Sequence, residues 1–384
     1  MAVEPVSRPA AQAAGRYAWA EPGTEDLGGG VYRIPLPLPG DALTAVNVYA
    51  LTDSEGVDLV DAGMALAAAR EQLAAALRQL GYGVGDVRNF FITHVHRDHY
   101  TLAVELRRAH RGAIALGEGE RANLRAVHAV ASGRRERATV AGLHRQGASE
   151  LAGRLGGQDA PNGPPDLTQW EDPDHWLADG TDLDVRSRTL RVVHTPGHTR
   201  GHVVFHDAAS AALFAGDHVL PHITPSIGFE PAGNRMALRD YLGSLELMLA
   251  LPDSRLLPAH GPVADSTHRR VTELLAHHET RLTQTREAVS AGMSTAYEVA
   301  KAIPWTRRRR NFADLELISQ LLATNETAAH LEVLLLRGEV TRQAAPDGTE
   351  LYSPAEPGPA DSDLAAAGPT ATEPEPTEPE PTEP

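Results

Sequence analysis

The stretch FITHVHRDHY at residues 91–100 decides the fold, because it joins an apolar run to a dense group of polar side chains. His94, His96, Asp98 and His99 lie within six consecutive positions, directly after that run. The apolar run predicts a short buried strand, which would place these four side chains at its end. Such crowding is typical either of an ordinary polar loop or of a metal site, and the rest of the chain distinguishes the two.

The composition is that of an ordinary globular chain, and it limits the kinds of site the chain can build. The 384 residues, 42% of them apolar, suffice for a large core and two domains. There is no cysteine, which excludes disulfides, thiolate nucleophiles and cysteine zinc sites. No apolar run reaches the roughly 20 residues of a membrane span, and residues 1–23 lack the apolar segment of a signal peptide. We therefore expect a cytoplasmic protein without a membrane association.

The acidic charge is concentrated at the C-terminus. Residues 356–384 hold eight acids and no base, so the formal net charge changes from −16 to −8 when they are removed. This mild acidity disfavours nucleic acid as a partner, since nucleic-acid binders carry basic surfaces. The repeat TEPEPTEPEPTEP cannot bury a core, and we predict a disordered Pro/Glu-rich tail over residues 355–384.

The segment before residue 265 alternates strand-like and helical patterns. Strands are expected within 31–62, helical spacing covers 64–81, and a second strand and helix follow at 87–92 and 102–112. This alternation predicts a layered α/β domain. Residues 118–180 read as helices followed by a loop, and we interpret them as an insertion at one edge of the core.

The segment after residue 265 has a different pattern. A polar helix over 266–292 is expected to link it to the first domain. TAYEVAKAI, FADLELISQLLAT and ETAAHLEVLLLRGEV predict three short helices, and VTRQAAPDGTELYS predicts a hairpin with an Asp-Gly turn. Three helices and a hairpin indicate a small winged-helix domain over residues 293–354. We interpret its arginine run, 307–310, as a solvated surface.

Histidine and aspartate recur after three further apolar runs. These are HTPGHTRGH at 194–202, AGDH at 215–218 and PAHGP at 258–262. Four strand ends of this kind can converge on one cleft. Neutral imidazole and carboxylate bind zinc, iron or manganese, and two neighbouring ions would share a water and lower its pKa.

In chain order, THVHRDH, TPGHT, AGD and PAHG resemble the metal-binding motifs of the metallo-β-lactamase-fold hydrolases. The resemblance implies an αββα sandwich, which we place at residues 29–265. We expect residues 1–28 to form a flexible N-terminus. The resemblance also implies two zinc ions, with iron or manganese as alternatives. By the resemblance, the first ion is held by His94, His96 and His198, the second by Asp98, His99 and His260, and Asp217 bridges the two.

Four further residues are expected to support this site. Asp61 in LVDAG matches a family position that braces the metal loop, and Asp98 would also orient the attacking hydroxide as the catalytic residue. Thr195 and Thr199 flank a ligand motif and are expected to orient its loop. His222 follows the bridging aspartate and is a candidate for substrate binding.

The C-terminal segments TAYEVAKAIPW and ETAAHLEVLLLRGEV are similar to the winged-helix domain of one branch of that family. That branch includes acyl-thioester hydrolases and an endoribonuclease. The resemblance implies a binuclear metallo-hydrolase whose metal-bound hydroxide attacks an acyl thioester or a related small-molecule ester. The alternatives are a metal-dependent endoribonuclease, a lactone or β-lactam hydrolase, and a non-catalytic module that binds through the winged helix. A small-molecule substrate is the expected partner, and a homodimer stays open.

Overall fold

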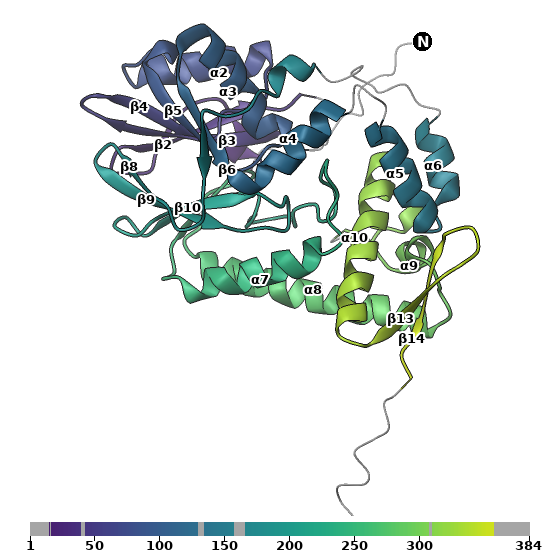
Figure 1. Cartoon of the computed structure of the whole chain (residues 1–384). Helices are drawn as coiled ribbons and strands as arrows, with labels where there is room; N and C mark the ends of the chain where they lie inside the picture. The colour runs from purple at the N-terminus through teal and green to yellow at the C-terminus, as the bar shows by residue number, and fades with distance from the viewer. Residues whose placement is uncertain are drawn as a thin grey trace, which may run out of the picture.

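Two β-sheets packed face to face form the centre of the computed structural model, which describes residues 15, 17–39, 43–129, 134–156, 166–306 and 309–356 (Figure 1). The tail beyond Glu356 and the side chains of Arg307 and Arg308 lie outside the described residues. The larger sheet has seven strands in chain order. They are β1 (Glu25–Asp26), β2 (Val31–Pro37), β3 (Ala45–Asp53), β4 (Gly56–Val60), β5 (Val87–Ile92), β6 (Ala113–Gly117) and β7 (His175–Leu177).

The smaller sheet has five strands in the order β12-β11-β10-β9-β8. They are β8 (Asp182–Val185), β9 (Arg188–His194), β10 (Val203–Asp207), β11 (Ala212–Gly216) and β12 (Arg255–Pro258). Aromatic rings from both sheets fill the layer between them. Tyr49 meets Phe214 edge to face at 5.4 Å between ring centroids, and Phe91 meets Phe205 at 6.1 Å. Edge-to-face pairs of this kind add to the stabilisation that burial of the rings gives.

Helices cover the outer face of each sheet (Figure 1). Helices α2 (Ala67–Gln79) and α3 (Arg97–His110) pack against the seven-stranded sheet, with the 3-10 turn η2 (Val84–Asp86) between them in the chain. Helices α7 (Ala237–Ala250) and α8 (Thr267–Ser290) pack against the five-stranded sheet. The layers are therefore helix, sheet, sheet, helix, which confirms the predicted αββα sandwich.

The N-terminal part of the chain and the start of α3 differ from the prediction. The 3-10 turn η1 (Ala18–Ala20) and strand β1 lie within the range predicted as flexible, and Arg33 Nη1 donates to the Trp19 carbonyl at 2.6 Å. Helix α3 begins at Arg97 rather than near residue 102, so Asp98 and His99 lie in its first turn. An acidic residue there is favourable, because the first turn exposes unpaired backbone N–H groups.

The predicted insertion packs against the C-terminal helices. It contains η3 (Glu118–Glu120), α4 (Arg121–His128), α5 (Arg134–Arg145), α6 (Ser149–Gly156) and η5 (Leu167–Gln169). Helices α5 and α6 lie beside α9 and α10 (Figure 1), and the Tyr297 N–H donates to the Gln146 carbonyl at 3.0 Å. Strand β7, near the end of the predicted insertion, pairs with β6 and so belongs to the seven-stranded sheet.

The C-terminal segment consists of α9 (Ala296–Ala302), η6 (Phe312–Asp314), α10 (Leu317–Leu336) and a hairpin of β13 (Val340–Ala344) and β14 (Glu350–Pro354). The hairpin with its Asp-Gly turn is confirmed. The prediction of two short helices between residues 312 and 340 was wrong, because α10 is continuous. Thr324 and Thr327 donate to carbonyls one turn earlier, those of Gln320 and Ala323, so the polar midpoint does not break the helix. The winged-helix assignment stays a prediction.

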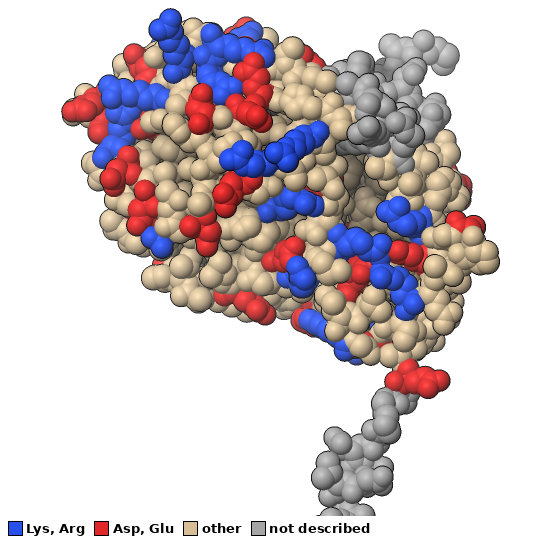
Figure 2. All heavy atoms as spheres, in the orientation of Figure 1, with Lys and Arg blue, Asp and Glu red and all other residues tan. Residues whose placement is uncertain are grey.

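One hydrophobic cluster extends from α7 and α8 through α6 into α9 and α10. The predicted two domains therefore share a core. On the face shown in Figure 2, basic and acidic side chains are interspersed over the described surface. None of the described helices is long and apolar enough to span a membrane.

Candidate metal centre

The sequence-predicted ligands come from four separate segments that meet at one edge of the sandwich. Each segment follows a strand: β5, β9, β11 or β12. The structure brings all seven side chains together in two groups, and the atoms within each group lie within 4.8 Å of one another. The first group is His94, His96, His198 and Asp217; the second is Asp98, His99 and His260.

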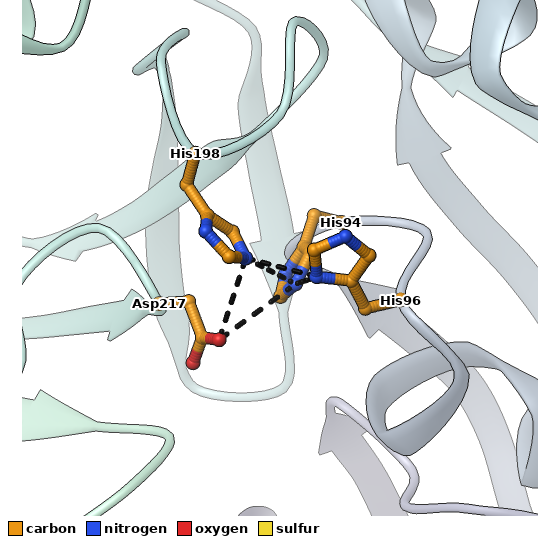
Figure 3. Close-up of side chains that lie close together, drawn as sticks. All are labelled: His94, His96, His198 and Asp217. Carbon is orange, nitrogen blue, oxygen red and sulfur yellow. Dashed lines mark hydrogen bonds and ion pairs between the residues drawn. The ribbon is translucent and has the colours of Figure 1, made fainter. Parts of the chain in front are cut away.

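Three imidazole nitrogens of the first group form a tight triangle (Figure 3). His198 Nε2 lies 3.2 Å from His94 Nε2 and 2.9 Å from His96 Nδ1, and the last two atoms are 3.0 Å apart. Asp217 Oδ2 completes the group at 3.4 Å from His198 Nε2. A tetrahedral zinc ion with bonds of about 2.0–2.1 Å has ligand atoms roughly 3.3 Å apart. The observed spacing is close to that value.

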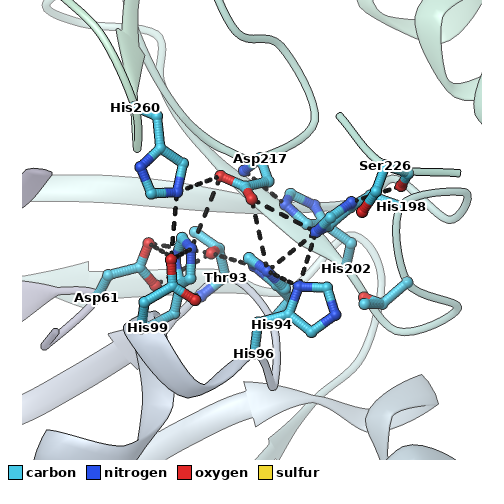
Figure 4. A network of polar contacts seen from close by, with 12 residues as sticks. Asp61, Thr93, His94, His96, His99, His198, His202, Asp217, Ser226 and His260 are labelled. Atoms are coloured by element: carbon cyan, nitrogen blue, oxygen red, sulfur yellow. Dashed lines mark hydrogen bonds and ion pairs between the residues drawn. The ribbon is translucent and has the colours of Figure 1, made fainter. Parts of the chain in front are cut away.

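The second group shares Asp217 with the first (Figure 4). Asp217 Oδ1 lies 3.3 Å from His260 Nε2 and 3.7 Å from His99 Nε2. Asp98 Oδ2 lies 3.4 Å and 3.7 Å from the same two nitrogens. Among the described residues, His99 Nε2, His260 Nε2 and Asp217 Oδ1 are buried without a hydrogen-bond partner. Buried polar atoms rarely lack a partner, so three such atoms at one point fit the role of ligands to a cation.

The outward nitrogens of three histidines are fixed by hydrogen bonds. His198 Nδ1 donates to the Ser226 carbonyl at 2.9 Å, and His260 Nδ1 donates to the Ala45 carbonyl at 2.7 Å. His99 Nδ1 donates to Asp61 Oδ2 at 2.8 Å. A carbonyl or carboxylate oxygen can only accept, so each Nδ1 carries the proton. The inward Nε2 atom of a neutral ring then has a lone pair available for a metal ion.

The charge balance differs between the two groups. Burial lowers the pKa of His96 to about 3 and that of His198 to about 4, so these rings are neutral at pH 7. For His99, burial opposes the charged form, but the carboxylates of Asp61, Asp98 and Asp217 outweigh it and raise the pKa to about 10. The first group therefore offers lone pairs, and the second offers a strongly negative environment. Both properties fit divalent cations.

Asp61 lies beside the β5–α3 loop and accepts hydrogen bonds from Thr93 at its start. This position agrees with the expectation that Asp61 braces the metal loop. Asp61 Oδ1 accepts from the Thr93 N–H at 2.9 Å, and both carboxylate oxygens lie 3.0 Å from the Thr93 hydroxyl. Its φ of 58° is in the left-handed region, which Asp adopts more readily than most residues. Asp61 thus contacts a metal-facing histidine and the loop that carries two others.

Thr195 and Thr199 act through neighbours rather than on the predicted ligands directly. The Thr195 hydroxyl lies 2.8 Å from His202 Nδ1, and His202 Nε2 accepts from the Asp217 N–H at 3.1 Å. The Thr199 hydroxyl donates to Glu120, a fully buried carboxyl whose pKa is raised to about 7 by burial. Both threonines therefore fix the β9–β10 loop through hydrogen bonds.

Several supporting residues were not predicted. Asn123 donates to both Glu120 and Glu230, at 2.7 and 2.8 Å, and Glu230 accepts from the Arg200 N–H. Asn47 Nδ2 donates to the carbonyls on either side of the His260 motif, those of Pro258 and Gly261, at 2.9 and 2.8 Å. These are isolated polar residues within apolar or helical segments, so the sequence has no spacing signal that would identify them.

Close packing limits the size of the side chain at position 197, directly before His198. Gly197 has a φ of 142°, and a Cβ at this position would lie 2.4 Å from Tyr241 Cβ on α7. Only glycine fits there without displacing the loop. His222, predicted as a substrate contact, is in neither metal group and instead lines a separate cavity.

Comparison with known proteins identifies relatives over the part of the chain that contains the four motifs. A family model described as the metallo-beta-lactamase superfamily matches residues 41–260. The "Beta-lactamase-like protein 2 homolog" of Caenorhabditis elegans is 30% identical over 156 residues, which are 38% of this chain and 49% of that protein. The "Lactamase-like protein nscB" of Aspergillus fumigatus is 35% identical over 143 residues, 33% of this chain and 41% of that protein. The chain thus spans less than half the length of these two relatives.

Two solved structures are similar over a larger part of the chain. A metallo-beta-lactamase family protein from Thermus thermophilus is 28% identical with a TM-score of 0.70, covering 86% of this chain and 100% of that one. A beta-lactamase domain protein from Burkholderia ambifaria is 27% identical with a TM-score of 0.67, covering 86% and 93%. A match of this extent includes residues outside 41–260.

Proposed function

The chain belongs to the metallo-β-lactamase superfamily, and on that premise we propose that it is a metal-dependent hydrolase of acyl thioesters or related small-molecule esters. The observation that carries the proposal is the carboxylate of Asp217, which lies between two groups of inward-facing donor atoms. In the proposal, His94, His96 and His198 would hold one ion, Asp98, His99 and His260 would hold the second, and Asp217 would be shared by both.

The donor set suits zinc, with iron or manganese as alternatives, because imidazole and carboxylate bind all three. When bound, such a pair of ions lowers the pKa of a shared water and offsets the negative charge that develops on the attacked oxygen. The histidines contribute orientation, since their outward N–H groups are fixed by Ser226, Ala45 and Asp61. Little reorganisation is then needed when substrate arrives.

Asp98 is proposed as the catalytic residue, because it is the most accessible member of the second group. Its side chain is 14% exposed, compared with 0% for His99 and 2% for His260. Burial raises its pKa, but His99 and His260 outweigh this and hold the pKa of Asp98 well below its usual range, so it is a carboxylate. It can accept a hydrogen bond from the attacking water and so align the water oxygen with the carbonyl carbon.

Hydrolysis then uses one water for each ester. The water oxygen bonds to the carbonyl carbon, the carbon–sulfur bond breaks, and the thiol leaves with one of the water protons. Asp98 directs the attacking oxygen, and the supporting bonds of Asp61 and Glu120 keep the β5–α3 and β9–β10 loops in place. No separate side-chain nucleophile is required.

The test is thiol release from a panel of acyl thioesters by the zinc-loaded protein. Asp98→Asn should lower the rate by roughly 10²- to 10⁴-fold. The matched control is Asp265→Asn, which changes an exposed aspartate outside the two groups and should leave the rate unchanged. Absence of thiol release, together with Asp98-dependent cleavage of RNA or of lactones, would overturn the thioester proposal.

A further inference from the structure

A large cavity lies apart from the metal centre and has a strongly basic lining. Its volume is about 1130 Å³, and none of the seven metal-facing residues contributes to it. Its wall comes from the loop after Asp217, from α8, from residues 304–306 and 309–310, and from α10. Ligand pockets typically measure about 300–1,000 Å³, so this one has room for more than a single ion.

Positive charge in this cavity exceeds negative charge. Four arginines line it, Arg270, Arg281, Arg309 and Arg310, together with one carboxyl group, that of Glu326. Arg270 is neutralised by Glu273 at 2.8 Å. Within the part of the chain that the structure describes, the other three form no ion pair with a carboxylate. Three of the four lining arginines therefore have no carboxylate in ion-pair contact.

Arg281 is the most informative of the three, because it is buried. Its exposed fraction is 7%, and Nη1 donates to the Pro304 carbonyl at 2.9 Å and to Gln284 Oε1 at 3.1 Å. Its Cζ atom lies 4.2 Å from the centroid of the Trp305 ring. These contacts hold the guanidinium in place, and its Nε and Nη2 groups donate to no described residue. The one carboxyl group that acts on Arg281 electrostatically is that of Glu326, and burial raises the pKa of Glu326. The guanidinium groups in the lining therefore outnumber the carboxylates that could offset them, which favours an anion as the ligand.

The same loop forms a wall of the cavity and supports the metal centre. His222, Ile223 and Thr224 line the cavity, and the loop continues to Ser226, whose carbonyl accepts from His198. Arg270 fixes this loop by donating to the carbonyls of Leu220 and Ile223, at 2.6 and 3.0 Å. The cavity and the first metal group therefore lie on either side of a short, anchored segment.

We propose that this cavity binds an oxyanion group, a phosphate or a carboxylate, through Arg281, Arg309 and Arg310. Arginine is suited to this task because its planar fork matches both groups with paired hydrogen bonds.

Calorimetric titration of the zinc-loaded full chain tests the site, with inorganic phosphate and succinate as separate probes. Arg281→Gln should weaken binding by roughly 10- to 100-fold, the loss expected for charge-assisted hydrogen bonds. The double variant Arg309→Gln/Arg310→Gln, which changes two exposed residues and preserves the fold, should weaken it similarly. The matched control is Arg269→Gln, an exposed arginine of α8 outside the cavity, and it should bind as the parent does.

The outcomes separate the cavity from the metal centre. Asp98→Asn should bind the anion with parent affinity, and the tighter of the two probes identifies the oxyanion as phosphate or carboxylate. Binding that is lost in Asp98→Asn but insensitive to the arginine variants would place the anion at the metal centre and overturn the proposal, as would no binding of either probe. Since binding is read without turnover, a failure of thioester hydrolysis would leave this result standing.

Discussion

Replacing Asp61 with asparagine should lower the affinity for the zinc ion bound by Asp98, His99 and His260. The affinity for the ion bound by His94, His96 and His198 should not change. The Asp61 carboxylate accepts from the Thr93 N–H and from His99 Nδ1. Asparagine keeps one oxygen for Thr93 but places an amide NH₂ opposite His99 Nδ1, so two donors face each other. His99 would then shift its proton to Nε2, the atom that faces Asp98 and Asp217. Asparagine also adopts the left-handed backbone at this position, so the chain path is unchanged.

The expected magnitude follows from the lost hydrogen bond. A hydrogen bond to a charged group contributes about 1.5–3 kcal/mol, which corresponds to roughly a 10- to 100-fold loss of affinity. Zinc titration in competition with a chromophoric chelator measures the two equivalents separately. Thr93→Ser, which keeps the hydroxyl, is the control and should match the parent. If Asp61→Asn binds both zinc ions with the affinity of the parent protein, the proposed shift of the His99 proton to Nε2 is refuted. If the affinity for both ions falls equally, the variant has instead lost structure in general.

Other consequences of the structure can be tested in the same way. Phe205→Ala, in the layer between the sheets, should lower the free energy of unfolding by about 3–5 kcal/mol in a urea titration. Gly197→Ala should abolish binding of the zinc ion held by the three-histidine group, because the new Cβ would clash with Tyr241 and displace the loop. The same zinc titration measures this loss. Burial lowers the pKa of His330 from 6.5 to about 3 and that of His278 well below 6.5. Their contribution to stability is therefore complete above pH 6.5 and decreases by up to about 1.4 kcal/mol per pH unit for each ring as the pH falls below 6.5. Urea titrations at pH 7 and pH 5 measure this, and His330→Phe should reduce the difference. Chelation of the metal should abolish thiol release and lower the Tm, and added zinc should restore both.

The layers and the metal-facing residues could be predicted from the sequence because both depend on short-range patterns. A strand that runs directly into His94 and His96 fixes where those side chains emerge, and four such motifs in order restrict the fold. Asp61 was predicted differently, from the match of LVDAG to a position of the family that the chain resembles. The length of α10 could not be predicted, because Thr324 and Asn325 look like a helix boundary until their neighbours are known.

The supporting network and the basic cavity depend on contacts between distant segments. Glu120, Asn123 and Glu230 are polar residues from two parts of the chain that meet only after folding. The arginine run was interpreted as a solvated surface, and Arg309 and Arg310 are exposed. The sequence does not indicate that these two residues also line a cavity with Arg281, which belongs to the C-terminal half of α8. Pattern alone does not indicate which surface such residues share.

The shared hydrophobic cluster has a consequence for how the chain is made. Helix α10 packs on both α7 and α8, and it is followed only by the hairpin in the described structure. During synthesis the sandwich can begin to form as soon as β12 emerges, but the outer faces of α7 and α8 stay uncovered until residue 336 has left the ribosome. Nascent chains of this protein should therefore expose apolar surface late in translation and be clients of chaperones at that stage. Removal of α10 would leave an aggregating fragment, not a smaller enzyme.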